Sequence, residues 1–177
     1  PTVQLGEEFK SVAALDGKTF AIVNQAEEKA LFGPNNQNLG YDEYAKAFSS
    51  SNSGFAWKIE SLAGNADESI RSYYLIRLVK PDGSVFADDD WGGRYLNSQS
   101  TTGWCCFNLG LTGKKMGQDI DNGAVWEIQY VEGQGFSLKN IGTGLYKGFG
   151  TGTANAEEAA YWSFKQVIVD YSAAVAE

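Results

Sequence analysis

The chain contains no histidine among its 177 residues. Histidine is the commonest general base near neutral pH and a frequent zinc ligand. Its absence excludes Ser/His/Asp and Cys/His catalytic arrangements. The only two cysteines are adjacent, Cys105 and Cys106, so no third thiol or imidazole could complete a zinc site. The sequence therefore disfavours most hydrolase mechanisms and predicts no resident metal of that kind.

Positive charge is also scarce. Fourteen basic residues stand against 22 acidic ones, which gives a net charge of −8. A chain this acidic repels phosphate backbones and anionic lipid surfaces. No apolar run approaches the roughly eighteen residues of a membrane-spanning helix. Neither nucleic acid nor a membrane is an expected partner.

What the chain does contain is glycine and short apolar runs. It has 21 Gly and only three Pro, with 43% hydrophobic and 14% aromatic residues. Short apolar runs separated by Gly, Asn, Ser and Asp are typical of strands joined by tight turns. At this length the chain can bury one full core. The composition predicts an all-β fold in a single domain over residues 1–177.

A tryptophan strand occurs three times. In residues 55–62, 124–131 and 161–167, a Trp and the residue two positions later fall on one side of a period-two strand, with polar residues opposite. This pattern predicts that Trp57, Trp126 and Trp162 lie in the core. We expect three repeated units, called units one, two and three, which cover residues about 17–63, 72–132 and 134–168 and are followed by a tail at 169–177.

Further strands are expected before each tryptophan strand. Unit one should hold strands at 18–24 and 29–33 and a short helix or irregular strand at 41–48, and residues 6–12 should form a lead-in helix or strand. Residues 72–79 should open unit two, and 136–140 should open unit three. By sequence, 20–24 corresponds to 136–140, and Leu31-Phe32-Gly33 corresponds to Leu145-Tyr146-Lys147-Gly148. Residues 81–93 are the expected insertion in unit two.

Three four-stranded units with a Trp-x-Ile/Phe closing strand resemble a β-trefoil of the ricin-type lectin kind, over roughly residues 17–168. The chain differs from that family in having Phe55, Ala124 and Ala160 where a Gln usually precedes the Trp by two. The resemblance implies a β-trefoil with a long insertion in unit two. It also implies a lectin-like carbohydrate-binding module of a secreted or cell-surface bacterial protein.

Two tryptophans have no counterparts in the other units. Trp91 and Trp104 stand in Gly- and Ser-rich stretches, and Trp91 follows the acidic run Asp88-Asp89-Asp90. An indole can stack on the apolar face of a sugar while neighbouring polar groups bind its hydroxyls. We therefore expect a ligand site that uses Trp91 and Trp104 with the polar residues Asp89, Asp90, Arg94 and Asn97.

Other interpretations of the acidic run remain open. Asp88, Asp89 and Asp90 could form a solvated turn, or could bind a structural calcium ion, although the EF-hand spacing is absent. No other cofactor is expected. This asymmetry between the units suggests that unit two carries the main site.

The cysteine pair follows Trp104. Adjacent Cα atoms lie about 3.8 Å apart, below the usual disulfide range. A Cys105–Cys106 disulfide would rigidify the turn and present an apolar face to a ligand, so both cysteines are candidate site residues. The alternative is two free thiols on opposite faces of a strand.

Tyrosines in corresponding loops of units one and three could form weaker sites. Tyr146 is the candidate in unit three, and Tyr41 and Tyr44 are the candidates in unit one. Paired carboxylates such as Glu27-Glu28 and Glu157-Glu158 could in principle serve a glycosidase, but they stand in polar, turn-like stretches. No catalytic residue is expected.

The leading hypothesis is a non-catalytic carbohydrate-binding module, monomeric and part of a larger multidomain carbohydrate-active protein. Its ligand would be a polysaccharide or oligosaccharide. The alternative is a protein-binding β-trefoil, such as a protease inhibitor, that presents residues 80–93 or 110–117 to its partner. A glycosidase is the third hypothesis.

Overall fold

The computed structural model describes residues 2–33, 40–48, 54–86, 95–96, 122–147 and 154–170. Within these ranges the fold is all-β, as predicted, with nine strands in one sheet and a single four-residue α-helix. The strands are β1 Thr2–Glu8, β2 Phe20–Asn24, β3 Lys29–Phe32, β4 Gly40–Glu43, β5 Ala56–Ser61, β6 Tyr74–Val79, β7 Trp126–Val131, β8 Gly135–Asn140 and β9 Ser163–Asp170. The helices are α1 Tyr44–Ala47 and four 3-10 turns at Ala13–Leu15, Glu68–Ile70, Asn122–Ala124 and Ala156–Glu158.

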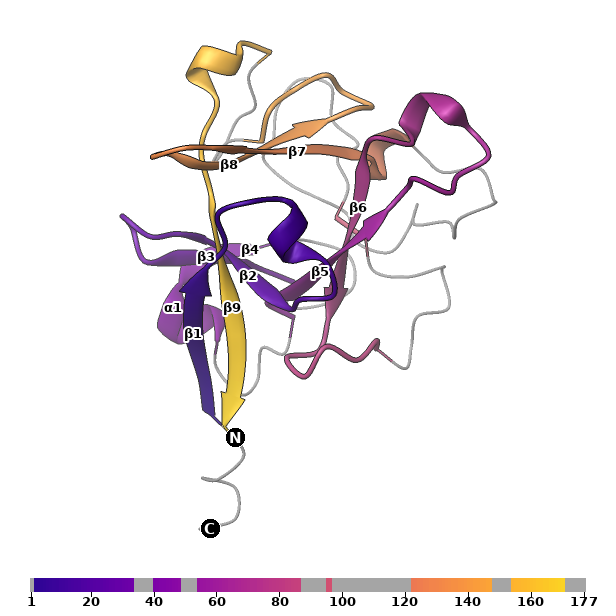
Figure 1. The fold of residues 1–177 in the computed structure, drawn as a ribbon. Helices are drawn as coiled ribbons and strands as arrows, with labels where there is room; N and C mark the ends of the chain where they lie inside the picture. Colours follow the sequence, from indigo (N-terminus) through magenta and orange to yellow (C-terminus); the bar gives the residue numbers. More distant parts are fainter. Residues whose placement is uncertain are drawn as a thin grey trace.

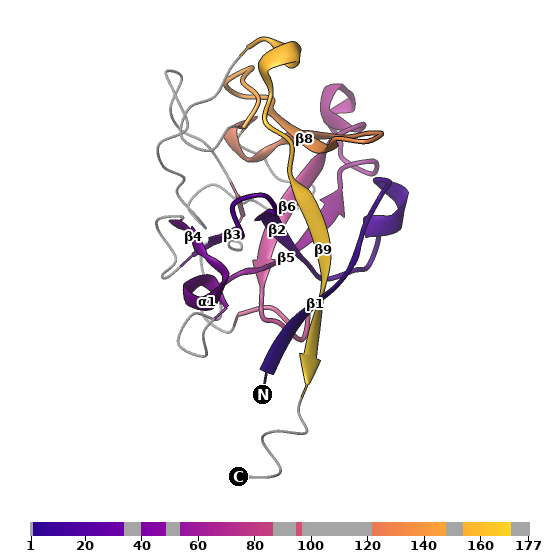
Figure 2. The same ribbon diagram turned by 90° about the vertical axis from the view of Figure 1, so that its left-hand side faces the viewer.

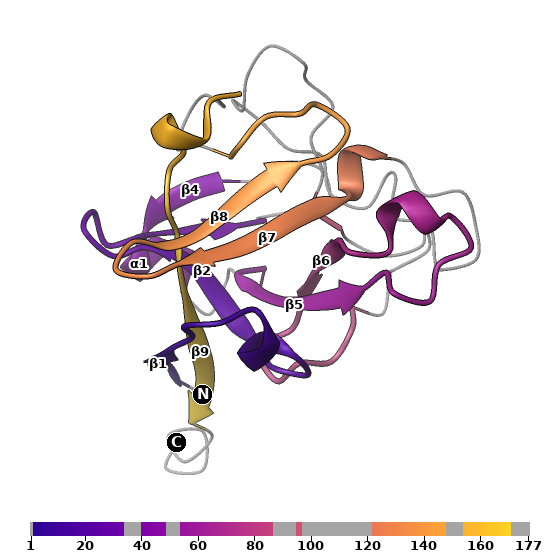
Figure 3. The ribbon, with the colours of Figure 1, turned by 45° about the horizontal axis from the view of Figure 1, so that its top comes forward.

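Six of the strands form a closed antiparallel ring. The pairing runs from β9 through β2, β5, β6 and β7 to β8. A bridge between Phe136 and Trp162 then closes the ring, because the backbone N–H of each residue donates to the carbonyl of the other at 2.9 and 2.8 Å. The β7–β8 and β5–β6 hairpins of this ring lie in front in Figure 3.

The interior of the ring is the main hydrophobic core. Trp57, Trp126 and Trp162 are fully buried there, as the repeated strand pattern predicted. Phe164 stacks between Phe20 and Phe136, with ring centroids 4.7 and 4.4 Å apart. Alternate residues of each strand face this core because successive Cβ atoms of a strand point to opposite sides.

A second apolar cluster covers the outside of the ring on one side. It contains the outward residues of β2, Ala47 of α1, and Phe55, which directly precedes β5. Val3 and Leu5 of β1 pack against it. The segment at 41–48 contains both expected elements in succession, the end of β4 and then α1. This cluster explains why α1 and the β3–β4 pair lie against the ring (Figure 2).

Strand β1 lies outside the ring and pairs along the outer part of β9, from Thr2 with Asp170 to Glu8 with Lys165. The two strands run side by side, and the chain's N terminus and the end of β9 lie at the same end of the molecule (Figure 1). The expected lead-in segment at 6–12 therefore contributes the end of a strand, which pairs with a segment far away in sequence. The expected tail at 169–177 begins as the last two residues of β9.

The same pairing rule recurs around the ring. The opening strand of each unit pairs with the unit's own tryptophan, and the residue three positions later pairs with a residue of the segment that follows, in strand β3 for unit one and in an isolated bridge for the other two units. The pairs are Phe20–Trp57 with Val23–Ala30, Tyr74–Trp126 with Arg77–Tyr95, and Phe136–Trp162 with Lys139–Tyr146.

Corresponding positions in the three units follow from this rule. Leu31, Leu96 and Lys147 come directly after the three second partners, so they occupy the same position relative to these pairs. The correspondence of Leu31 with Leu145 expected from the sequence is therefore wrong by two residues. The alternation of apolar and polar residues cannot reveal this error, because a shift of two residues leaves each side chain on the same face of a strand.

Candidate functional site

A half-buried tyrosine, Tyr41 of β4, lies at the centre of a polar cluster in unit one. Its hydroxyl donates to Glu27 Oε2 at 2.6 Å and accepts from Asn24 Nδ2 at 3.0 Å. The Lys29 ammonium lies over its ring, 5.3 Å from the centroid. We call Asn24, Glu27, Lys29 and Tyr41 the Tyr41 cluster.

The turn after β2 holds the Tyr41 cluster in place. The Glu27 backbone N–H donates to Asn24 Oδ1 at 3.3 Å, so one side chain both caps the turn and binds the tyrosine. Burial, and next the hydrogen bond to Glu27, raise the pKa of Tyr41 well above its usual value of 10. The phenol therefore remains a hydrogen-bond donor at any physiological pH.

Tyr146, another of the predicted site residues, lies in a similar setting in unit three. It is half-buried, bridges to Lys139 of β8, and has the Lys139 ammonium 5.5 Å above its ring. Asn140 caps the following turn as Asn24 does, because its Oδ1 accepts from Thr143 N at 3.0 Å. We call Lys139, Asn140, Thr143 and Tyr146 the Tyr146 cluster.

Trp162 contacts residues of both unit one and unit three. The Tyr41 ring meets its indole edge-on, with centroids 6.0 Å apart and planes at 82°. The Lys147 ammonium lies 5.4 Å from the same indole. One buried tryptophan thus contacts a residue of the Tyr41 cluster and the residue that follows Tyr146.

Lys147 is a buried lysine in a position that the other units fill with leucine. It is 4% exposed, against 1% for Leu31 and 0% for Leu96. Burial lowers the pKa of its ammonium from 10.5 to about 7. A core position occupied by an ionisable amine weakens the fold at low pH, which makes unit three chemically unlike the other two.

The matching tyrosine of unit two is buried instead of being available to a ligand. Tyr95 is 1% exposed, and its hydroxyl donates to both carboxylate oxygens of Glu60 at 2.9 and 3.0 Å. Arg77 pairs with Glu60 at 3.3 Å and lies over the Tyr95 ring at 5.3 Å. These contacts anchor Tyr95, so it supports the fold.

Most of the predicted ligand residues fall outside the described part of the chain. These are Trp91, Trp104, Asp89, Asp90, Arg94, Asn97, Cys105 and Cys106, together with Asp88 of the alternative calcium site. In the described ranges no group of three or more Asp, Glu, Cys or His could hold a metal ion. No helix described by the structure is long and apolar enough to cross a membrane.

The described cluster residues that the sequence did not predict as ligand residues are Asn24, Glu27, Lys29, Lys139, Asn140 and Thr143. One signal was present: an Asn ends both corresponding strands, four residues after Phe20 and after Phe136. The third tyrosine candidate, Tyr44, lies in α1 and packs on Phe48 with centroids 5.2 Å apart. The structure therefore does not bring it into the Tyr41 cluster.

Comparison with known proteins gives a likeness in fold. No family model matches the chain, and no curated protein matches it in sequence. A solved structure, the GlcNAcα1-4Gal releasing endo-β-galactosidase from Clostridium perfringens, is similar in fold with a TM-score of 0.54 and 18% identity. The match covers 87% of this chain but only 33% of that enzyme. The likeness therefore concerns a fold that makes up about a third of the longer protein.

Proposed function

We propose that the protein is a non-catalytic carbohydrate-binding module with a β-trefoil fold. The single observation that carries this proposal is the pair of half-buried tyrosines, Tyr41 and Tyr146. Each has a cation over its ring and a turn-capping asparagine beside it. An aromatic face bordered by fixed polar groups is the arrangement that sugar recognition uses.

Four features support the trefoil. The ring has six strands, each unit contributes its opening strand and its tryptophan strand, and the same pairing rule recurs in every unit. The two corresponding residues Leu96 and Lys147 also share one hydrogen-bond pattern. The N–H of each donates to the opening strand, and its carbonyl accepts from the indole N–H of Trp126 or Trp162.

The likeness to the endo-β-galactosidase supports a role with carbohydrate. That protein is named as an endo-β-galactosidase, and this chain resembles about a third of its length. We propose that this chain is likewise one part of a larger secreted or cell-surface carbohydrate-active protein of a bacterium. It would hold the parent enzyme on a polysaccharide or oligosaccharide, and several weak sites together would give useful avidity.

The proposed ligand residues are Tyr146 with Lys139 and Thr143, Tyr41 with its cluster, and the sequence-predicted residues around Trp91 and Trp104. Asn140 is fully buried and only holds the turn, because its Nδ2 donates to Gly123 O and its Oδ1 accepts from Thr143 N. Binding by stacking needs no general base, which suits a chain without histidine. The non-catalytic role stays part of the proposal, and it is tested separately by measuring turnover.

Calorimetric titration with soluble glucans, xylans, mannans and β-galactans tests the site. We expect the wild-type chain to bind at least one of them, and Tyr146→Ala to weaken that binding about tenfold, or roughly 1.4 kcal/mol. Tyr41→Phe, which removes only the hydroxyl held by Glu27 and Asn24, should weaken it less. Trp91→Ala and Trp104→Ala test the predicted site in unit two.

Tyr73→Ala is the matched control, because Tyr73 is also half-buried but packs in a different apolar cluster, with Leu62 and Leu75. Tyr73→Ala should keep full binding. Full binding by all four site variants as well would contradict the site assignment. Absence of binding by the folded wild-type chain to every glycan in the panel would contradict the proposed function.

A further inference from the structure

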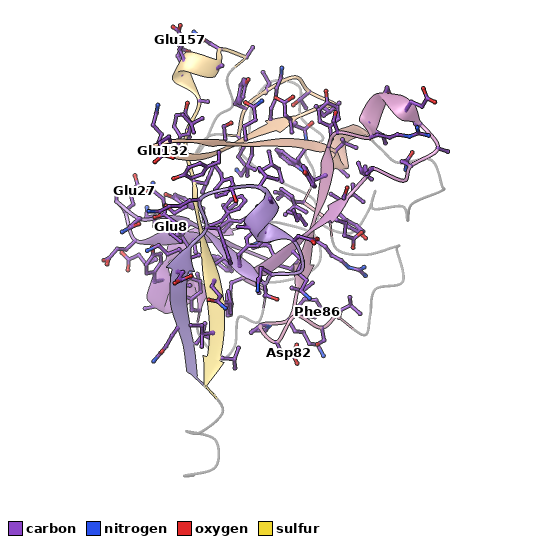
Figure 4. All side chains as sticks on the ribbon, in the orientation of Figure 1. Glu8, Glu27, Asp82, Phe86, Glu132 and Glu157 are labelled. Atoms are coloured by element: carbon purple, nitrogen blue, oxygen red, sulfur yellow. The ribbon has the colours of Figure 1, made fainter. Side chains whose placement is uncertain are left out.

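A shallow hollow of about 320 Å³ lies away from both tyrosine clusters. It is lined by Gly17, Lys18 and Thr19 directly before β2, by Pro81 and Asp82 after β6, and by Gln166, Val167 and Val169 of β9. Figure 4 shows Asp82 in the lower right part of the view and Glu27 of the Tyr41 cluster at the left. The hollow is therefore separate from the site described above.

The walls of the hollow are fixed by hydrogen bonds. Val167 N donates to Thr19 O at 3.1 Å and ties β9 to the start of β2. The turn at 80–84 is closed by Gly83 N donating to Lys80 O and Lys80 N donating to Ser84 O, both at 2.8 Å. A preformed wall lets a small ligand bind without first ordering the chain.

The Asp82 carboxylate is held in its ionised form. Its Oδ1 accepts from Ser84 Oγ at 2.6 Å and from Ser84 N at 2.9 Å. These bonds, the hydroxyl first, lower the pKa of Asp82 below its usual value. With Oδ1 occupied, Oδ2 remains the oxygen that a ligand hydroxyl could reach.

Gly83 keeps the turn close to its neighbours. Its φ of +87° lies in the region that favours glycine. A Cβ there would lie 2.8 Å from Thr19 Oγ1 and 3.0 Å from Lys58 Nζ. A hydroxyl and an ammonium therefore approach the turn beside Asp82.

We propose that this hollow is a further carbohydrate site that binds one neutral sugar ring. Its volume is at the small end of ligand pockets, which suits a ligand of that size. Pro81 and Val169, both half-buried, offer apolar surface for a C–H face. Asp82, Lys18 and Thr19 offer an acceptor and donors for hydroxyl groups. The assignment of a sugar rests on the proposed function.

The test is a titration of the isotope-labelled chain with methyl glycosides of galactose, glucose, mannose, xylose and N-acetylglucosamine, followed by amide NMR. We expect at least one glycoside to shift the amide signals of Gly17, Thr19 and Val167 in a saturable way. Asp82→Asn keeps an acceptor for Ser84 and removes the negative charge. It should weaken this binding about tenfold or more.

Asp67→Asn is the matched control. Asp67 Oδ1 accepts from Ser69 N at 3.0 Å and from Ser69 Oγ at 2.7 Å, the same local motif as at Asp82 but outside the hollow. It should leave the binding unchanged.

Three other outcomes overturn the assignment in different ways. Glycan binding that shifts only amides of the tyrosine clusters, or that Asp82→Asn leaves intact, would overturn this site and leave the proposed function standing. Equal loss in Asp82→Asn and Asp67→Asn would attribute the effect to turn stability and overturn the site. Absence of binding to any glycoside or polysaccharide would overturn the site and the proposed function together.

Discussion

Leu96 in unit two and Lys147 in unit three occupy the same backbone setting with opposite chemistry. Leu96 N donates to Ile76 O at 2.8 Å, and Lys147 N donates to Leu138 O at 2.7 Å. The Leu96 carbonyl accepts from Trp126 Nε1 at 2.8 Å, and the Lys147 carbonyl accepts from Trp162 Nε1 at 3.3 Å. The shared backbone bonds show that this position does not require a lysine.

The tyrosines that precede these two residues also differ, because the one in unit two is buried and the one in unit three is half-buried. Tyr95, before Leu96, is buried and bonded to Glu60, whereas Tyr146, before Lys147, is half-buried. The described part of unit two therefore serves the core at these two positions. Unit three keeps an ionisable amine and an accessible ring. The comparison indicates that unit three is less optimised for stability, which is common where a protein binds a ligand.

Replacing Lys147 with leucine should produce the largest change. The unfolded chain holds the Lys147 proton up to a pKa near 10.5, and the folded chain holds it only to about 7. Wild-type stability should therefore rise as the pH increases from 7 to 10.5. Lys147→Leu should raise the unfolding free energy most below pH 7, by roughly 3–5 kcal/mol, and this advantage should shrink across that window. Urea denaturation of both proteins from pH 6 to pH 10.5 measures it.

The reverse substitution, Leu96→Lys, is the matched control. It should lower the unfolding free energy and give unit two the same rise of stability with pH. A Lys147→Leu variant that is no more stable at pH 6, with an unchanged pH profile, would contradict the view that Lys147 weakens the fold.

The three core tryptophans provide a finer comparison. Trp126 and Trp162 donate through Nε1 to Leu96 and Lys147, whereas the buried Nε1 of Trp57 has no hydrogen-bond partner among the described residues. Each Trp→Phe change loses a similar packed volume. Only the changes at 126 and 162 also remove a hydrogen bond.

Trp57→Phe should therefore cost less than Trp126→Phe by about 1–3 kcal/mol, with Trp162→Phe between them because its bond is longer. Urea midpoints with their m-values give this order. Equal losses of unfolding free energy at all three positions would indicate that packing alone, without the indole hydrogen bonds, sets the cost of the substitution.

Much of the ring could be predicted from the sequence. Alternation around Trp57, Trp126 and Trp162 predicts the three closing strands and their buried faces, because the period of two is a local property. The opening strands followed from short apolar runs next to turn residues. Each of these signals depends on only a few neighbouring residues.

Other features depend on contacts between distant segments. The pairing of β1 with β9 joins the two ends of the described chain, so no pattern among neighbouring residues predicts it. The burial of Lys147 depends on a strand register, and the alignment of units one and three predicted from the sequence differs from that register by two residues. The hydrogen bonds of Tyr41 with Glu27 and Asn24 likewise required the β2–β3 turn and β4 to be placed together.

The most direct test of the central claim is calorimetric titration of the whole chain with the polysaccharide panel, while released reducing ends are measured in the same samples. A carbohydrate-binding module should bind at least one polysaccharide saturably and release no reducing ends. Release of products, or no binding by folded protein to any polysaccharide, would contradict it.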